Sequence, residues 1–170
     1  MTTRVEEPIG RDAPLAERRA KHRARADGLL EHADTLLRKD RLTAADRLQV
    51  SEKIWGAVVH TLKAVAAAQG WVFRRPRAAD SMKSYLGRLS RDGDINVLFR
   101  AVSDYHTNFY QDHVPEDDMR HGVDTARTLN AKLWAAAELI PQGASPPTYV
   151  GTLQQLERDA RRRSSPRSRG

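Results

Sequence analysis

The two residues whose types and spacing best suit catalysis are Arg100 and His106, which have five residues between them in a segment with a helical pattern. An arginine guanidinium can hold a phosphate through two parallel hydrogen bonds. A histidine imidazole gains or loses a proton near neutral pH. Cleavage of RNA without a metal ion needs both abilities, because the 2′-hydroxyl must lose a proton while charge builds on the phosphoryl oxygens. Arg100 and His106 are therefore candidate catalytic residues.

Helix geometry limits how Arg100 and His106 act together. Six positions along a helix correspond to about 9 Å of rise and about 120° of rotation, so the two side chains do not touch. They either bracket one phosphate from two sides or meet the same residues of a second protomer, in which case activity requires a dimer. A structural role is the alternative. Arg100 is spaced for an ion pair with Asp104 worth about 0.3–0.5 kcal/mol, and His106 lies beside an apolar stripe.

A second candidate site is the basic and aromatic segment Trp71-Val-Phe-Arg-Arg-Pro-Arg77. Single-strand binders combine cations that follow the phosphate backbone with aromatic rings that stack on bases. Arg74, Arg75 and Arg77 are thus candidate nucleic-acid contacts, unless the two rings cap the core and the arginines are solvated. Asn108 is a further candidate, either orienting a phosphate or His106, or making a helix cap or inter-helix hydrogen bond.

Several classes of chemistry are disfavoured by what the sequence lacks. There is no cysteine, so neither a disulfide framework nor a thiolate site is expected. No glycine-rich phosphate loop is present, and the histidines and acids between 106 and 121 lack the spacing of a metal site, so we expect no cofactor and no metal. The chain has no apolar signal core and no apolar run of about 20 residues, which predicts a cytoplasmic protein with no membrane association.

The positive charge is concentrated at the two ends of the chain. The formal net charge is +7 over 170 residues. Residues 1–25 hold seven basic and four acidic side chains, residues 141–170 hold six and two, and residues 26–140 are balanced at sixteen of each. Basic ends attract polyanions without reading their sequence, although they also serve simply as solvated tails.

The hydrophobic periodicity predicts an all-α protein, an antiparallel bundle of four or five helices with disordered basic ends. No strand is expected. Residues 1–14 are predicted to be a tail, 15–140 the helical domain, and 141–170 a linker, a weak helix and a basic tail. The expected helices cover about 15–39, 43–70, 78–89, 94–113 and 115–140, with a weak amphipathic helix over 149–163. Thr43 and Asp94 are the predicted caps of the second and fourth helices.

Two segments of this pattern resemble the HEPN superfamily, and in particular its branch typified by the archaeal paralogous-repeat (PaREP-type) families. The first is Ser51-Glu-Lys-Ile-Trp-Gly-Ala-Val-Val-His-Thr-Leu-Lys-Ala64, which is similar to the branch's second-helix pattern. The second is Tyr105-His-Thr-Asn-Phe-Tyr110, which is similar to its late His-x-Asn-Phe-Tyr element. With the flanking helices, the resemblance covers about residues 26–140.

The resemblance implies a helical domain that commonly forms a homodimer. Many members are metal-independent endoribonucleases with an Arg and, four to six residues later, a His in a cleft between protomers, and Arg100 and His106 fit that spacing. Ala101 departs from the pattern, because active members usually have Asn, Asp or His there. We therefore expect an RNA-targeting protein, a candidate ribonuclease of a toxin–antitoxin or defence system. The alternative is a non-catalytic module that partners a nucleotidyltransferase or binds nucleotide or nucleic acid, and a structural interaction domain is a third possibility.

Overall fold

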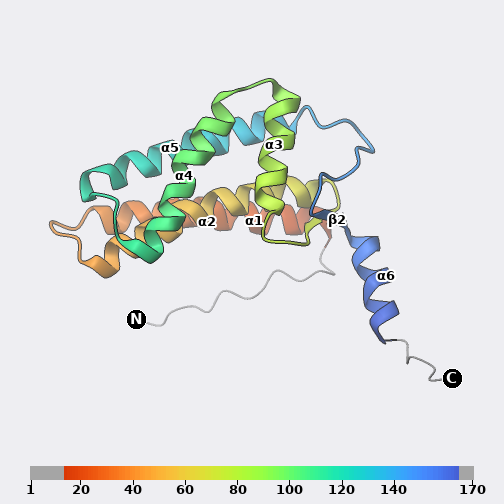
Figure 1. The fold of residues 1–170 in the computed structure, drawn as a ribbon, viewed down its shortest axis with the longest axis horizontal. Helices are drawn as coiled ribbons and strands as arrows, with labels where there is room; N and C mark the ends of the chain where they lie inside the picture. The colour runs from red at the N-terminus through yellow and green to blue at the C-terminus, as the bar shows by residue number, and fades with distance from the viewer. Residues whose placement is uncertain (1–13, 165–170) are drawn as a thin grey trace.

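The computed structural model describes residues 14–164 and shows a bundle of helices with one small sheet (Figure 1). The expected all-α class is confirmed, and the weak helix predicted over 149–163 corresponds to a helix over 153–164. The predictions for residues 1–13 and 165–170 lie outside the described residues. None of the helices within 14–164 has the length and apolar character needed to cross a bilayer. The elements are α1 (Leu15–Leu37), α2 (Ala44–Ala68), β1 (Trp71–Phe73), α3 (Ala78–Ser90), α4 (Asp94–Gln111), α5 (Glu116–Ala137), β2 (Val150–Thr152) and α6 (Leu153–Ser164).

Helices α1 and α2 form a long antiparallel hairpin whose second helix begins at a reciprocal cap. The Thr43 hydroxyl accepts a hydrogen bond from the Asp46 amide at 3.1 Å, and the Asp46 carboxylate accepts one from the Thr43 amide at 3.0 Å. This capping box satisfies two amides that the first turn leaves unpaired. The Lys39 ammonium also donates a hydrogen bond to the Asp46 carboxylate. The hydrogen bonds from Lys39 and then from Thr43 lower the pKa of Asp46 to about 2. The predicted cap at Thr43 is confirmed.

Helix α2 lies at the centre of the bundle, with α1 on one side and α4 and α5 on the other (Figure 1). A helix contacted on several sides must be apolar over most of its surface. This explains why α2 buries residues on more than one face, among them Val50, Ile54, Val58, Leu62 and Val65. The arrangement places α4, which holds both candidate catalytic residues, directly against α2.

Several observed helix ends differ from the predicted ones by a few residues, and hydrogen bonds explain two of the differences. The amide of Asp94 donates to the Asp92 carboxylate at 3.0 Å, so Asp92 rather than Asp94 supplies the side-chain acceptor at the start of α4. Helix α5 ends at Ala137 instead of continuing to Ile140, because the amides of Leu139 and Ile140 donate three residues back and tighten the chain into a turn.

The expectation that the chain has no strand is wrong. Strands β1 and β2 pair antiparallel, with Val72 opposite Gly151 in the register. Each strand has three residues, too few for an alternating pattern to be recognised, and their partners lie almost eighty positions apart in the sequence. The pairing returns the end of the predicted linker to the bundle and buries Val150 in the core. Helix α6 continues from β2 and extends away from the bundle (Figure 1).

Candidate functional site

The candidate catalytic residues Arg100 and His106 lie on one helix but on different sides of it. Both side chains are exposed. Arg100 follows the exposed Val97 by one helical turn, so it lies on the side of α4 turned away from the core. His106 lies on the side turned toward α2, where its ring stacks on Trp55. A single protomer therefore does not bring the guanidinium and the imidazole together.

The His106 ring is held by a short series of aromatic contacts. Its centroid is 4.9 Å from that of the Trp55 indole, with 23° between the ring planes. Trp55 in turn meets Phe99 edge to face at 5.5 Å. Offset-stacked and edge-to-face arrangements are the favourable geometries for aromatic pairs. The stack covers one face of the imidazole while the side chain remains exposed.

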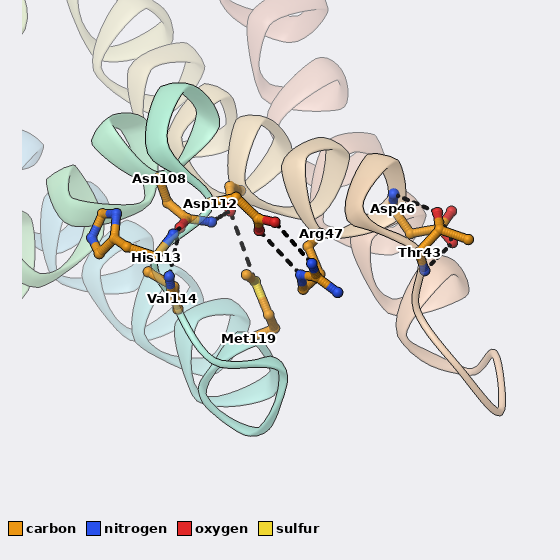
Figure 2. Close-up of polar contacts among 9 residues, drawn as sticks. Thr43, Asp46, Arg47, Asn108, Asp112, His113, Val114 and Met119 are labelled. Atoms are coloured by element: carbon orange, nitrogen blue, oxygen red, sulfur yellow. Dashed lines mark hydrogen bonds and ion pairs between the residues drawn. The ribbon is translucent and has the colours of Figure 1, made fainter.

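Asn108 is a structural residue rather than a surface contact (Figure 2). Its side chain has no exposed surface, and its amide nitrogen donates to the Ser51 hydroxyl at 2.7 Å. Its carbonyl oxygen accepts from the backbone amides of His113 and Val114, at 2.5 and 2.6 Å. The interpretation of Asn108 as a cap and inter-helix hydrogen bond thus describes its contacts, and the side chain has no polar atom facing solvent for a nucleic acid.

The end of α4 is also tied to α2 by an ion pair. Arg47 donates from two nitrogens to the two carboxylate oxygens of Asp112, at 3.1 and 2.8 Å (Figure 2). This bidentate geometry lowers the pKa of the Asp112 carboxyl, chiefly through the hydrogen bond from Arg47. Together with Asn108, it fixes the last turns of α4, and therefore the position of His106, relative to α2.

The basic segment after β1 forms an exposed site together with a residue from the other end of the chain. Arg74, Arg75, Arg77 and Tyr149 line a hollow of about 620 Å³. The amide of Arg74 donates to the Tyr149 carbonyl at 3.0 Å, which holds the two segments side by side. The Tyr149 ring is exposed, whereas Trp71 is buried and belongs to the core. The exposed aromatic ring beside these arginines is thus Tyr149 rather than Trp71.

A second hollow, which we call the cationic hollow, collects positive charge from both ends of the described chain. It has a volume of about 600 Å³ and lies where α1, α2, β1 and α6 meet. One acid, Asp159, is among its lining residues. The titratable side chains that can carry positive charge there are Arg18, His22, Lys63, Arg74, Arg75 and Arg163. Arg18, near the start of the described residues, and Arg163, near their end, therefore line the same hollow.

Arg74 lies on the boundary between the two hollows because of the strand pairing. A Cβ atom on Gly151 would come 2.3 Å from the Arg74 Cδ, so only glycine at this position of β2 lets the side chain cross the strand. The Arg74 guanidinium then donates to the Asp159 carboxylate of α6 at 2.6 Å. Glycine in β2 and an acid in α6 together set the direction of this arginine.

Beside the cationic hollow, two histidines share a hydrogen bond. The Nδ1 atoms of His22 and His60 are 2.9 Å apart, so one ring donates and the other accepts. Burial, followed by the charge of the Lys63 ammonium, lowers the pKa of His22 to about 4 and that of His60 to about 3. Burial, followed by the charge of Arg25, also lowers the pKa of Lys63. Both imidazoles are therefore neutral at pH 7.

Sequence reasoning found Arg74, Arg75 and Arg77 but missed their neighbours. Arg18 and His22 belong to α1, whose charged pattern is typical of a solvated helix, and Arg163 lies in the basic end, for which the sequence predicts only a weak helix. The concentration of positive charge near both ends of the sequence is the only sign of this cluster in the sequence. It does not predict the hollow, because the sequence does not reveal the β1–β2 pairing that brings these segments together.

Comparison with protein-family models, curated proteins and solved structures finds no match for this chain. The contacts, charges and exposure of its own residues therefore indicate what the protein does.

Proposed function

We propose that this protein binds single-stranded RNA across the surface formed by the segment after β1 and the residue before β2. The observation that carries the proposal is the hollow where Arg74, Arg75 and Arg77 lie beside the exposed ring of Tyr149. Arginine side chains bind successive phosphates, and an aromatic ring stacks on a base regardless of its identity. The expected binding is therefore tolerant of sequence and sensitive to salt.

The test is the salt dependence of binding to an unstructured RNA oligonucleotide with a 5′-hydroxyl. Replacing Arg77 with Gln should lower the slope of log K against log salt by about 0.7, the value for one lost phosphate contact on a single strand. Tyr149→Ala should weaken binding at every salt concentration without changing the slope, because stacking releases no counterion. The matched control is Arg38→Gln, in the exposed turn between α1 and α2 at the other end of the hairpin. Equal loss in Arg38→Gln and Arg77→Gln would refute the assigned surface.

We propose further that a dimer of this protein is a metal-independent endoribonuclease of a toxin–antitoxin or defence system, with Arg100 and His106 as its catalytic residues. What favours this second function is the exposed His106 ring held on Trp55. His106 would act as general base or acid, and Arg100 would stabilise the charge on the phosphoryl oxygens. Because the two side chains lie on different sides of α4, each complete site would combine Arg100 of one protomer with His106 of the other.

The direct test is incubation of RNA with purified protein in the presence of a chelator. The wild type should cleave the RNA to fragments with 2′,3′-cyclic phosphate ends, and His106→Ala should not. His113→Ala is the matched control, since His113 is exposed two positions beyond α4 and has no proposed role. Intact RNA after incubation with a large excess of wild-type protein would rule out the enzyme and leave the binding module.

If the wild type leaves RNA intact, the proposed function is that of a non-catalytic binding module. The resemblance to HEPN proteins then suggests a small nucleotidyltransferase as its partner. Co-expression of the two proteins followed by gel filtration tests this pairing. Separate elution of the two chains would exclude a stable complex.

A further inference from the structure

The cationic hollow has the charge distribution of an anion site. Its cations come from the three helices around it, with Arg18 on α1, Lys63 on α2 and Arg163 on α6, and from the segment after β1. The acid in the lining, Asp159, is engaged with Arg74. The positive side chains therefore outnumber the negative one by a wide margin, in a concave space that concentrates their field.

Two cations of this hollow are enclosed by the fold, whereas Arg75 and Arg163 at its edge are exposed. Arg18 is only 7% exposed, and the Lys63 side chain is half-buried. Burying cations near one another is unfavourable unless an anion accompanies them. The lowered pKa of Lys63, caused by burial and then by Arg25, reflects that cost. An anion bound beside Lys63 would lower that cost.

Size and wall chemistry indicate what kind of anion fits. The volume of about 600 Å³ is well above that of a single phosphate and within the range of small-molecule sites. Phe73, Leu156 and Ala160 give the hollow an apolar side next to its cations. A molecule with several negative charges and a flat apolar part matches both surfaces. A metal ion does not, since within residues 14–164 no cluster of three or more His, Cys, Asp or Glu side chains is present.

We propose that the cationic hollow binds the phosphate groups of a nucleotide, either free or at the 5′ end of an RNA strand. Lys63, Arg75 and Arg163 hold the phosphates, and Phe73 and Leu156 contact the nucleoside. As a site for RNA ends the inference rests on the proposed RNA binding, but a free nucleotide binds here whether or not RNA does.

The Asp159 carboxylate competes with a bound anion for Arg74. Its carboxylate pairs with Arg74 at 2.6 Å and so takes the place of a ligand anion on that arginine. A phosphate entering the hollow meets the repulsion of Asp159 or displaces it from Arg74. Removal of this charge should therefore strengthen nucleotide binding, the opposite of what loss of a cation does.

The experiment is isothermal titration of the full-length protein with three probes in the presence of a chelator: ATP, inorganic tripolyphosphate and adenosine. ATP and tripolyphosphate should bind and should raise the melting temperature with increasing concentration, as any ligand of the folded state does. Adenosine should bind far more weakly. A hexaglutamate peptide tests the other class of anion. Absence of ATP binding at low salt, or tighter binding of the peptide than of ATP, would overturn the proposal.

Three variants assign the binding to the hollow. Lys63→Met should weaken ATP binding about tenfold or more, a change worth about 1.4 kcal/mol, yet raise the melting temperature of the free protein, because a desolvated cation is removed. Asp159→Asn should tighten ATP binding, and Arg38→Gln should leave it unchanged. A merely damaged fold would lose affinity and stability together. If Lys63→Met does not fold, Arg163→Gln in the last turn of α6 takes its place.

Failure of this inference and failure of the proposed function have different signatures. Loss of 5′-hydroxyl RNA binding in Arg77→Gln, with ATP binding absent, supports the RNA surface and refutes the hollow. ATP binding that depends on Lys63, with no RNA binding, supports the hollow alone. Tighter binding of a 5′-triphosphorylated RNA than of its 5′-hydroxyl form, lost in Lys63→Met, identifies the RNA end as a source of the phosphates. Equal binding of the two RNAs identifies the free nucleotide.

Discussion

The Nδ1 atoms of His22 and His60 lie 2.9 Å apart, and this single hydrogen bond joins α1 to α2 beside the cationic hollow. The acceptor ring must be neutral at Nδ1, so the two rings adopt different tautomers. Protonation of both would bring two cations into contact next to Lys63. The charges that act on the pair are those of Arg18 and Arg25 from α1 and Lys63 from α2. The adjoining hollow adds Arg74, Arg75, Asp159 and Arg163.

This pair should make the protein lose stability in mild acid. The folded pKa values of His22 and His60, about 4 and 3, are below the ordinary 6.5, so the unfolded chain binds more protons below pH 6.5. The free energy of unfolding should therefore fall as the pH decreases from about 6.5 toward 4. Urea denaturation between pH 7 and 5 measures this, because carboxyls with lowered pKa values, such as Asp46 at about 2, stay ionised there.

The control for the pH effect is the double variant His22→Asn with His60→Asn. An asparagine amide lies near the position of an imidazole Nδ1, so the hydrogen bond is kept while the titration is removed. The stability of this variant should depend much less on pH between 7 and 5. A wild-type profile that is flat over this range would show that the two rings are ordinary surface histidines.

Replacing Asn108 with Ala should destabilise the protein by roughly 2–4 kcal/mol. The variant leaves the amides of His113 and Val114 without their acceptor and the Ser51 hydroxyl without its donor, and unpaired buried polar groups are costly. Asn108→Asp keeps the acceptor oxygens but buries a charge. Denaturant unfolding of the two variants, with exposed Thr107→Ala as control, gives the values. A change below about 0.5 kcal/mol in Asn108→Ala would contradict the network in Figure 2.

The helices could be predicted because their periodicity, caps and prolines are local signals. Thr43 and Asp46 lie three residues apart and make the expected capping box. The two segments quoted for the HEPN resemblance contact each other through Ser51 and Asn108 and through Trp55 and His106. That contact explains why the polar and aromatic residues of both segments stand out from an otherwise Ala- and Leu-rich pattern.

The sheet and the cationic hollow could not be predicted because they depend on contacts between distant segments. Strand β1 gains its partner only when residues 150–152 return to the bundle, and Tyr149 and Asp159 reach the arginines by the same route. The sequence also placed Arg100 and His106 on one helix without showing which side of it each occupies. Packing of His106 on Trp55 decides that, and it is a tertiary contact.

Two glycines in helices should respond in opposite ways to substitution by alanine. A Cβ on Gly122 would come 2.3 Å from the ring of Tyr105, which is fixed by a hydrogen bond from its hydroxyl to the Asp118 carbonyl. Gly122→Ala should therefore destabilise the protein by about 1–3 kcal/mol or more through overpacking. At Gly28 nothing lies within 4 Å, so Gly28→Ala should stabilise α1 by about 0.5–1 kcal/mol. Melting temperatures that shift in the same direction for both would refute this packing of α4 on α5.

The proposed endoribonuclease can be tested for a shared site by mixing two inactive variants. In a dimer where Arg100 of one protomer acts with His106 of the other, an Arg100→Ala chain paired with a His106→Ala chain has one intact site and one with neither residue. Random exchange makes half of the dimers mixed, so an equimolar mixture should recover about a quarter of wild-type activity. A site built within one protomer would recover none, because every chain would lack one of its two residues. Recovery also requires that the two chains exchange, which gel filtration of differently tagged chains establishes independently. Since Arg100 and His106 lie on different sides of α4, restored cleavage is the expected result, and its absence from a mixture of exchanged dimers would contradict the shared site.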